Sequence, residues 1–399
     1  MGSMKDKVAI VGMGCTKFGE LWDKSIEDLV VDSCYEAIED AGIEPKDIQS
    51  AWYGSRESGL TGAHLARALK TDYIPITRVE NFCCGGQDVL RNTCYGVASG
   101  AYEIALACGV EKTKDHRGFF GLFIQEPLDR GLTEWDIPPA SQFGQYATRY
   151  FHRYRDYYKW DFEGFKRVLA IINVKNHDNG LLTPKAHLHR KITIDDVLKA
   201  RIISWPFTLY DACGMSDGGA AAIVTTPEIA KTLRKDYVLV KAQALAVGSG
   251  QSTMQSEFDF VHIPENVAAA KAAYKDAGIT NPRQEISIAE LHDCFSSTEL
   301  ITIEDLEFSP RGKAPEDIKA GRFLLKGEQP INTDGGLKCF GHPLSASGLR
   351  MAYEIYKQLQ GKVDNPERQV ENPKLGLIHN VGGNVGIHVS AVTIFGLPE

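Results

Sequence analysis

The chain has 399 residues, of which 43% are hydrophobic and 24% are charged, so it can bury a large core and form more than one domain of ordinary size. Its formal net charge of −8 argues against a surface that binds nucleic acid or an anionic membrane. No apolar run reaches the length of a membrane helix. We therefore expect a cytoplasmic protein with no nucleic-acid partner and no membrane partner.

The cysteines indicate the redox compartment of the protein and whether it has a structural metal site. The nine cysteines are odd in number and scattered, which favours reduced thiols over a secreted disulfide framework. No paired C-x-x-C blocks occur, so we expect no metal on this chain. The segment Met1-Gly2-Ser3-Met4 resembles an expression scar rather than a signal peptide, which agrees with the cytoplasmic assignment.

The first element expected is an apolar strand over residues 7–11 that runs into a glycine turn, Gly12-Met13-Gly14. A strand followed by glycines also occurs in dinucleotide-binding folds. That signal is weak here, because no helix begins directly after the glycines and no acidic residue ends a second strand at the required distance.

An amphipathic helix is expected next, from Ser25 onward. Apolar residues repeat along one face, Ser25 is a suitable N-cap with Asp28 in the first turn, and Gly42 is suited to end the helix. A strand over residues 48–53 follows.

The same order of elements occurs a second time. Residues 37–43 (AIEDAGI) and 273–279 (AYKDAGI) share a pattern, and each follows a strand that leads into glycines and precedes a turn and a strand. Further on, the helix behind Cys83 is matched by a helix over residues 349–359 behind Gly341-His342-Pro343. We infer two copies of one α/β unit, packed about a pseudo-two-fold axis that would bring Cys83 close to His342.

The pattern is lost between about residues 112 and 206. Aromatic residues are frequent over residues 151–160, and a basic cluster follows at His187, His189, Arg190 and Lys191. We predict an insertion that covers the site. Its aromatic residues are expected in a core and its basic cluster on a solvated face, with phosphate binding as the alternative.

The stretch Asn81-Phe82-Cys83-Cys84-Gly85-Gly86-Gln87 precedes the helix expected over residues 88–99. A helix N-terminus presents free N–H groups and the positive end of the helix dipole, and both favour a thiolate. The glycines allow a substrate to approach the backbone closely. One of the two thiols is therefore a candidate nucleophile, and the alternative is a buried, inert pair.

Three later motifs complete a possible set of reacting groups. They are His292-Asp293-Cys294-Phe295 beyond a strand end, Gly341-His342-Pro343 at a helix entry, and the glycine turn Asn380-Val381-Gly382-Gly383-Asn384. Carbon–carbon bond chemistry on thioesters needs a thiol that takes the acyl group, a base, a second acid or base for the α-carbon proton, and donors for two oxyanions. These motifs supply each of them.

On these residues the chain resembles the thiolase family, most closely the sterol-carrier-protein type and its prokaryotic relatives. The similarity covers nearly the whole chain. It runs from Val8-Ala9-Ile10-Val11-Gly12, through Ala107-Cys108-Gly109-Val110-Glu111, to Gly335-Gly336 and Gly341-His342-Pro343. The His-Asp-Cys-Phe motif at residues 292–295 is the specific mark of that subtype.

The resemblance implies a role for each candidate residue. Cys83 is the acylated nucleophile, and His342 deprotonates it and donates to the enolate oxygen. His292 completes this first oxyanion hole, and Cys294 is the acid and base for the α-carbon proton. The backbone N–H groups of Cys83 and Gly382 form the second oxyanion hole, for the thioester carbonyl.

The chain departs from the family pattern in two places. Asn380 stands where most thiolases carry the cysteine of a late Cys-x-Gly motif, so the proton-shuttle role passes to Cys294. Cys84-Gly85-Gly86 follows the nucleophile in place of a small residue, Ser or Thr, and Gly. Either Cys83 or Cys84 is then the acylated thiol, and the motif alignment favours Cys83.

The fold class implied is α/β, with duplicated thiolase-like βαβαβαββ halves in a five-layer αβαβα sandwich and an inserted lid or loop domain. We place the N-terminal half at residues 1–112 plus 207–235, the insertion at 113–206 and the C-terminal half at 236–399. Members of the family are typically dimers or tetramers, so we expect a homodimer or homotetramer. Prokaryotic relatives often work with a small OB-fold and zinc-ribbon protein, which makes such a partner subunit plausible here.

The activity implied is that of a 3-ketoacyl-CoA thiolase of the acetyl-CoA C-acyltransferase type, with coenzyme A as co-substrate, run as cleavage or as Claisen condensation. Phe119, Phe120 and Phe123, with the small Gly85 beside the nucleophile, suggest a bulky or aromatic acyl group such as that of benzoylsuccinyl-CoA. Two alternatives remain. One is a non-catalytic thiolase-like subunit that binds acyl-CoA or scaffolds a partner enzyme, and the other is a thiolase-like aldolase acting on CoA esters.

Overall fold

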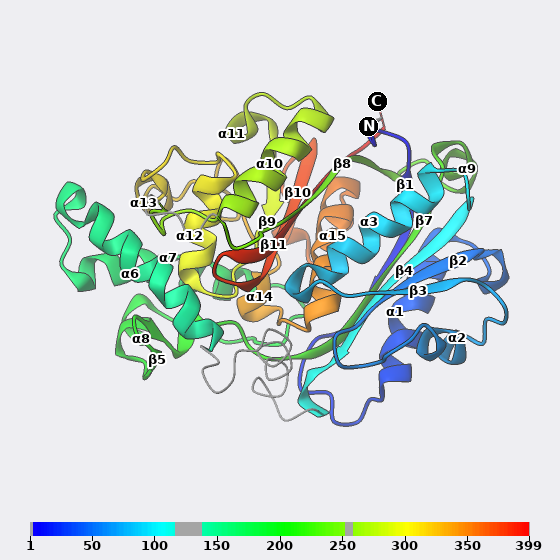
Figure 1. Cartoon of the computed structure of the whole chain (residues 1–399), viewed down its shortest axis with the longest axis horizontal. Coiled ribbons are helices and arrows are strands. Elements are labelled where there is room, and N and C mark those ends of the chain that lie inside the picture. Colours follow the sequence, from blue (N-terminus) through cyan, green and yellow to red (C-terminus); the bar gives the residue numbers. More distant parts are fainter. Residues whose placement is uncertain (1–2, 116–137, 252–257, 399) are drawn as a thin grey trace.

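The computed structural model describes residues 3–115, 138–251 and 258–398, and it shows an α/β fold that contains two copies of one unit (Figure 1). Residues 9–112 and 217–225 form the first copy, and residues 238–396 form the second. No helix in these described ranges is long and apolar enough to cross a lipid bilayer.

The first copy has the predicted order of strands and helices. Its elements are β1 (Ala9–Cys15), α1 (Ile26–Ala41), β2 (Ser50–Gly54), α2 (Ala63–Leu69), β3 (Ile76–Val79), α3 (Gly85–Ala98), β4 (Ile104–Lys112) and β7 (Asp217–Thr225). The ends of α1 are also as predicted. The Ser25 hydroxyl accepts the backbone N–H of Asp28 while the Asp28 carboxylate accepts that of Ser25, and Gly42 ends the helix with a φ of 70°.

The second copy repeats this order with one strand reduced. Its main elements are β8 (Val238–Val247), α10 (Pro264–Ala277), β9 (Ile288–Glu290), α12 (Ser296–Asp305), α15 (Leu344–Gln360), β10 (Leu375–Asn384) and β11 (Ile387–Gly396). At the place of β3, the described residues of this copy have a single parallel bridge between Ala289 and Ile331. The short helices of this copy are α11 (Pro282–Glu285), α13 (Ala314–Lys319) and α14 (Gly336–Cys339).

The strands of both copies join into one sheet. In the described residues it has nine strands in the order β3-β2-β4-β7-β1-β8-β11-β10-β9. The first five strands belong to the first copy and the last four to the second. The two blocks meet where Ala9 and Ile10 of β1 pair with Leu239 and Val238 of β8.

The helices arrange these two blocks into layers. α1 packs against β1, β4 and β7 on the outer face of the first block. α3 and α15 pack against each other between the blocks, and α15 contacts β4 and β7 of one block and β9 and β10 of the other (Figure 1). α10 covers β8 and β11. The predicted fold class, a thiolase-like sandwich of alternating helical and sheet layers, is confirmed.

One local prediction is wrong. The expected turn at Gly12 and Gly14 is part of β1, which continues to Cys15. A Cβ at Gly12 would lie 2.1 Å from the carbonyl oxygen of Ala37, and one at Gly14 would lie 2.1 Å from that of Ser33. These glycines let α1 lie directly against β1, which explains them without a bound dinucleotide.

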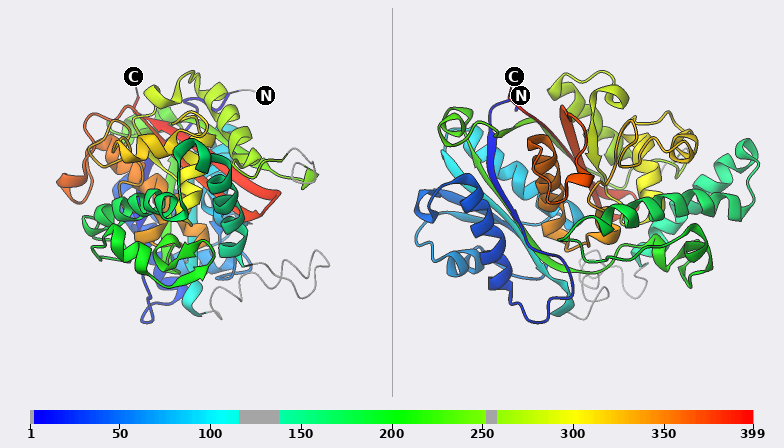
Figure 2. Two further views of the ribbon diagram at one scale, coloured as in Figure 1. Left: turned by 90° about the vertical axis from the view of Figure 1, so that its left-hand side faces the viewer. Right: turned by 180° about the vertical axis from the view of Figure 1, so that it is seen from behind.

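The segment between β4 and β7 forms a separate, mainly helical part. Its elements are α6 (Pro139–Tyr158), α7 (Phe162–Leu181), α8 (Ile194–Lys199), β5 (Ile202–Ser204) and β6 (Phe207–Thr208), and the short helix α9 (Pro227–Leu233) follows β7. Figure 2 shows α6 and α7 projecting from the layered core on the side opposite α1 and α2. Phe119, Phe120 and Phe123, which suggested a bulky substrate, lie outside the described residues. The predicted domain limits stay a prediction.

Candidate active site

Cys83 lies in a single 3-10 turn, Phe82–Cys84, directly before α3. Phe82 has a φ of 50°, a conformation that few side chains adopt, so the chain bends sharply here. The turn contacts α15, β10 and β11. The candidate nucleophile of the first copy therefore lies against elements of the second.

Cys84 has very different surroundings. It is completely buried, and its thiol lies 3.2 Å from the carbonyl oxygen of Asn380 and 3.1 Å from that of Val389, to either of which it can donate. It also packs against Val389 and Ala391. A thiol held by two backbone carbonyls inside the sheet is suited to a structural role, whereas Cys83 is partly exposed. The geometry favours Cys83 as the reactive thiol.

His342 reaches the site from the start of α15. Gly341 precedes it with a φ of 114°, and a Cβ there would lie 2.3 Å from the Ser216 hydroxyl oxygen, so only glycine fits. The Nδ1 atom of His342 lies 2.8 Å from the hydroxyl oxygen of Ser347 on the first turn of α15. This bond fixes the orientation of the imidazole ring.

His292 and Cys294 lie between β9 and α12. His292 is completely buried, and its Nδ1 atom lies 3.1 Å from the side-chain nitrogen of Asn380. Cys294 is 6% exposed, and its sulfur lies 3.6 Å from the hydroxyl oxygen of Thr298 on the first turn of α12. Both side chains are thus held by a single polar neighbour in an otherwise closed environment.

The predicted groups converge on one place. The sulfur of Cys83 and a ring nitrogen of each of His292 and His342 all lie within 4.8 Å of one another. The two imidazole rings have centroids 5.2 Å apart and are nearly perpendicular, at 79°. Burial is the main cause of the raised pKa of Cys294, and the Cys213 and Cys83 thiols add to it, which places Cys294 in the same neighbourhood.

Gly382 brings β10 against the nucleophile. A Cβ at this position would lie 2.7 Å from the backbone nitrogen of Cys83 and 3.1 Å from its Cβ, so a larger residue would displace the turn. The structure therefore places Cys83, His292, Cys294, His342 and Gly382 together at one site. Their individual roles stay proposals.

The acidity of Cys83 differs from the sequence-based expectation. Desolvation by the surrounding protein raises the pKa of the Cys83 thiol well above its usual value, and Cys84 adds to this rise. The Arg56 guanidinium lowers the pKa by a smaller amount. The raised pKa runs against the sequence-based expectation of a thiolate favoured by the start of α3, because burial of the thiol is its largest cause. Cys83 rests as a neutral thiol and needs a base when it attacks.

Both histidines are available as neutral groups. Burial lowers the pKa of His342 to about 3, and Arg350 adds to this effect. Burial also lowers the pKa of His292 well below its usual value, and the neighbouring His342 adds to the shift. At pH 7 each imidazole therefore has one protonated and one unprotonated nitrogen, as general base catalysis requires.

Comparison with known proteins gives the family. The family model described as "Thiolase, N-terminal domain" matches residues 8–117, and "Thiolase C-terminal domain-like" matches residues 246–396. The acetyl-CoA acetyltransferase of Methanothermobacter thermautotrophicus is 35% identical over 98% of this chain and 100% of its own length. The chain belongs to the thiolase family.

Other relatives indicate the range of proteins that this thiolase resembles. The benzoylsuccinyl-CoA thiolase subunit BbsB of Thauera aromatica is 28% identical over 95% of this chain and 96% of its own. Sterol carrier protein 2 of Bos taurus is 29% identical over 99% of this chain and 74% of its own. A solved structure titled "Ltp2-ChsH2(DUF35) aldolase" superposes with a TM-score of 0.82 at 25% identity, over 99% of this chain and 98% of that one. By its family this thiolase is an enzyme, an acyltransferase.

The sequence-based reasoning missed the residues that orient the thiolase site. Ser347 contacts His342, and Thr298 contacts Cys294. The two residues of each pair are separated by at most five positions, a spacing at which side chains at the start of a helix can meet. This local signal could have identified both. Asn380 contacts His292 across 88 positions, which no local pattern reveals.

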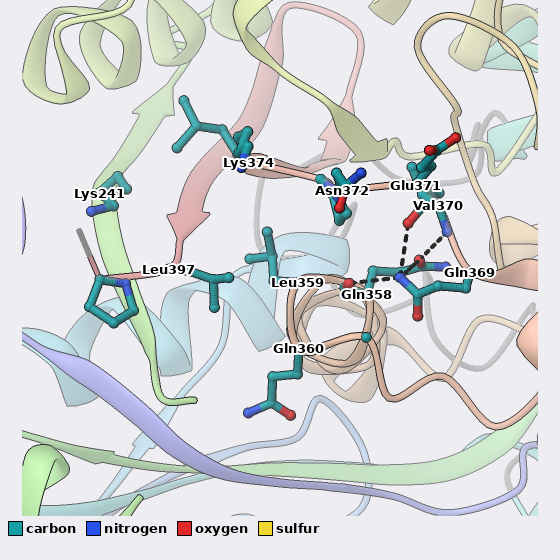
Figure 3. Close-up of a pocket in the computed structure, with 14 residues that line it drawn as sticks. Lys241, Gln358, Leu359, Gln360, Gln369, Val370, Glu371, Asn372, Lys374 and Leu397 are labelled. Carbon is teal, nitrogen blue, oxygen red and sulfur yellow. Dashed lines mark hydrogen bonds between the residues drawn. The ribbon is translucent and has the colours of Figure 1, made fainter. Parts of the chain in front are cut away.

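Another concave surface of this thiolase lies at the far end of α15. Its lining includes Lys241, Gln358, Gln369 and Lys374 (Figure 3). α15 begins beside His342 and has 17 residues, so this groove is about 25 Å from the paired imidazoles. It contains no cysteine and no histidine, so it offers neither a nucleophile nor a neutral base for acyl transfer.

Proposed function

We propose that this chain is a 3-ketoacyl-CoA thiolase of the acetyl-CoA C-acyltransferase type, which transfers an acyl group through a thioester on Cys83. The observation that carries the proposal is the convergence of the Cys83 sulfur with one nitrogen of His292 and one of His342 within 4.8 Å. A neutral thiol beside two neutral imidazoles can be deprotonated at the moment of attack and supplied with hydrogen bonds for the oxyanion that follows.

The first half of the cleavage forms the acyl-enzyme. The Cys83 sulfur attacks the 3-keto carbon of the substrate while Nε2 of His342 takes the thiol proton. The bond between C2 and C3 then breaks, and its electron pair forms an acetyl-CoA-like enolate, which keeps any substituent that C2 carries. The protonated His342 and the Nε2–H of His292 donate to the enolate oxygen, and Cys294 transfers its proton to the α-carbon.

The second half returns the enzyme to its starting state. The Cys294 thiolate takes the thiol proton of coenzyme A, whose sulfur attacks the acyl carbon on Cys83. The Cys83–acyl bond breaks, and His342 returns its proton to the Cys83 sulfur. Claisen condensation is this sequence in reverse. Coenzyme A is thus the co-substrate, and every proton taken up in one half is returned in the other.

The second oxyanion hole rests on Cys83 and Gly382. We propose that the N–H groups of both residues donate to one thioester carbonyl oxygen, and the close approach of Gly382 to the Cys83 backbone nitrogen supports this. Burial raises the pKa of Cys84 well above its usual value, and its interactions with the backbone of Ala391 and of Gly382 offset part of this rise.

The decisive test is the mass of the intact chain after incubation with acetoacetyl-CoA or acetyl-CoA. We expect a single acyl adduct on Cys83 in the unaltered chain and in Cys84→Ala, and none in Cys83→Ala. Both variants should be checked for an unchanged thermal midpoint. An adduct that persists in Cys83→Ala but is lost in Cys84→Ala would transfer the role to Cys84, and no adduct in any chain would overturn the proposal.

The acyl group is a separate part of the proposal. We propose a bulky, aromatic 3-ketoacyl-CoA such as benzoylsuccinyl-CoA, and the support is the 28% identical relative that carries this name. Gly85 does not add support, because a Cβ there would lie 3.1 Å from the Ser345 hydroxyl oxygen and its small size serves packing. Cleavage of acetoacetyl-CoA much faster than an aryl 3-ketoacyl-CoA would reject this part and favour the acetyl-transferring relatives.

An aldolase acting on CoA esters is the second candidate, and the 0.82 TM-score with a structure titled as an aldolase favours it. Such an enzyme would not need the thiol of Cys83. Turnover of a β-hydroxyacyl-CoA that survives in Cys83→Ala would support the aldolase. A chain that binds acyl-CoA without any turnover would instead be a scaffold or binding subunit.

We also propose that the chain works as a homodimer or homotetramer together with a small OB-fold and zinc-ribbon subunit. Support comes from the names of two similar proteins, one called a thiolase subunit and the other joined to ChsH2(DUF35) in its title. Purification of the untagged chain from cells that co-express a small OB-fold and zinc-ribbon protein, followed by light scattering, tests both statements.

A further inference from the structure

The proposed reaction uses two neutral histidines in opposite ways. His342 must accept a proton at Nε2, whereas His292 must donate one from Nε2. A neutral imidazole has a single N–H, so the partner of each Nδ1 atom decides what Nε2 can do. Within the described residues neither Nε2 atom has a hydrogen-bond partner, although both are buried.

Ser347 sets the form of His342. The Ser347 hydroxyl donates to the carbonyl oxygen of Pro343 at 3.0 Å, which leaves its oxygen free to accept the Nδ1–H of His342 at 2.8 Å. With the proton on Nδ1, Nε2 of His342 has a lone pair directed to the site. This is the form that a base for Cys83 needs.

Three hydrogen-bonded side chains, Thr393, Gln87 and Asn380, set the tautomer of His292. A backbone carbonyl fixes the orientation of the Gln87 amide in this series. The Gln87 amide nitrogen faces the carbonyl oxygen of Ala391 at 3.4 Å and the side-chain oxygen of Asn380 at 2.9 Å, and both are acceptors. The Gln87 oxygen accepts the hydroxyl of Thr393 at 3.0 Å. Exchanging the oxygen and nitrogen of Gln87 would set two oxygens against each other at Ala391, so the amide has one favourable orientation.

The orientation of Gln87 determines that of Asn380. Because the Asn380 oxygen accepts from Gln87, its nitrogen faces Nδ1 of His292 at 3.1 Å and the sulfur of Met351 at 3.2 Å. An amide nitrogen can only donate, so Nδ1 of His292 must accept. The proton of His292 is then on Nε2.

We infer that Gln87 and Asn380 are positioning residues, which hold His292 as the hydrogen-bond donor of the site while Ser347 holds His342 as the acceptor. This inference rests on the proposed thiolase reaction for its consequence, although the two tautomers themselves can be measured without turnover. Gln87, Asn380 and Thr393 are at most 2% exposed, so water does not compete for these bonds.

The three side chains of Thr393, Gln87 and Asn380, called the relay from here on, also affect metal binding. Cys83, His292 and His342 form a set of soft and imidazole ligands that zinc could use. A metal binds an unprotonated ring nitrogen, and the relay keeps the proton on Nε2 of His292. Replacing Asn380 by aspartate would reverse this bond, because a carboxylate holds Nδ1–H and frees Nε2, as in carboxylate–histidine–zinc sites.

The direct test is ¹⁵N NMR of the ring nitrogens in the full chain labelled with ¹⁵N-histidine, with His292→Gln and His342→Gln used to assign the signals. We expect a protonated Nε2 in His292 and a protonated Nδ1 in His342 at pH 7. Nδ1–H in His292 would overturn the inference, whether or not the chain has thiolase activity.

Two variants and a matched control test the consequence. Asn380→Asp, and separately Gln87→Glu, which turns the Asn380 amide round, should move the His292 proton to Nδ1. Each should lower kcat about 100-fold, the size of effect found when an oxyanion-hole donor is lost. KM should change less than threefold. Asn372→Asp is the same substitution at an exposed position in the groove of Figure 3 and should leave the NMR signals and kcat unchanged.

Zinc inhibition gives a separate readout. We expect the Zn²⁺ concentration that halves the rate of Cys83 acylation to be at least tenfold lower in Asn380→Asp than in the unaltered chain or in Asn372→Asp. Unchanged tautomers, kcat and zinc sensitivity in both Asn380→Asp and Gln87→Glu would show that the relay is only structural. Loss of all turnover in the unaltered chain with the expected tautomers would reject the proposed function and leave the tautomer assignment intact.

Discussion

α3 and α15 are the equivalent helices of the two copies, and both begin at the active site with different chemistry. The first copy places Cys83 before its helix, and the second places His342 before its own. The duplication thus gives two similar helix starts facing each other, and the residues ahead of them are the proposed nucleophile in one copy and the proposed base in the other. Neither copy alone contains the reacting pair.

What the two helices retain in common is their contact surface. A Cβ at Gly86 of α3 would lie 2.6 Å from the carbonyl oxygen of Ser345, and one at Gly348 of α15 would lie 2.5 Å from the backbone nitrogen of Gln87. Each helix therefore presents a glycine where the other comes closest. The shared packing has been preserved on both sides while the chemistry ahead of it diverged.

The largest effect should follow removal of the base from the second copy. His342→Asn should lower kcat/KM about 1,000-fold, because the neutral Cys83 thiol loses its proton acceptor. The remaining rate should rise with pH as hydroxide replaces the imidazole. Steady-state thiolysis from pH 6 to 9 measures this, with His262→Asn as the control. A loss of less than tenfold would mean that His342 is not the base.

Removal of Cys294 separates the two proton transfers. Cys294→Ala should lower turnover about 100-fold, because the α-carbon proton loses its acid and base, while Cys83 can still be acylated. Exchange of the acetyl-CoA methyl protons in D₂O, followed by ¹H NMR, should stop in Cys294→Ala. Exchange at the original rate would assign that role to another group, and the nearby Cys213 would be the next to replace.

The helix contact itself can be perturbed. Gly348→Ala should destabilise the fold by about 2 kcal/mol through overpacking and lower kcat about tenfold, because α15 must move away from α3. Gly164→Ala, in the first turn of α7, is the control: a Cβ there would meet only side-chain atoms, the nearest at 3.2 Å, so its cost should be smaller than that of Gly348→Ala. Urea unfolding with parallel activity assays measures both. Equal stability of the two variants would contradict the close contact.

The smallest effect concerns acid stability, which the second copy should dominate. Burial lowers the pKa of His379 to about 3 and that of His388 to about 4, and His292 and His342 are lowered as well. Between these values and the ordinary pKa near 6.5 the unfolded chain binds more protons at these histidines, so their contribution to stability falls as the pH drops below about 6.5, whereas buried carboxyls with a raised pKa, such as those of Glu111 and Asp293, act in the opposite direction. For a single histidine the loss at pH 5 is about 2 kcal/mol.

This dependence can be checked with one substitution away from the site. The free energy of unfolding of His379→Gln should fall less steeply between pH 7 and pH 5 than that of the unaltered chain, whatever its value at pH 7. His262→Gln, outside the buried set, is the comparison. Identical slopes for all three chains would show that the buried histidines do not control acid stability.

Much of the fold could be predicted because the informative residues act locally. Ser25 and Gly42 identify the ends of α1 through capping, and the repeated A-x-x-D-A-G-I pattern identifies the duplication. The site followed from motifs at strand ends and helix starts, where α/β folds bring side chains together. These signals depend on neighbours within a few positions along the chain.

Other features depend on contacts between distant residues. The role of Gly12 and Gly14 requires knowing that α1 lies against β1, and the reduced strand at Ile331 requires the sheet itself. The raised pKa of Cys83 depends mainly on burial of the thiol in the folded chain, which neighbours along the sequence do not reveal. The bond between Asn380 and His292 joins β10 to the end of β9, and no sequence spacing indicates it.

The pairing of β1 with β8 gives the enzyme a built-in dependence on assembly. Within the described sheet, β1 and β8 pair at Ala9 and Leu239 and at Ile10 and Val238, and Val240 bonds to the backbone of Asp6 and Val8 beside them. The thiol and the imidazoles meet only when the two blocks are docked, through this seam and through the packing of α3 against α15. Turnover should therefore require that the two blocks are docked. A polypeptide cut in the exposed turn near Lys235 should regain turnover only when its two fragments recombine.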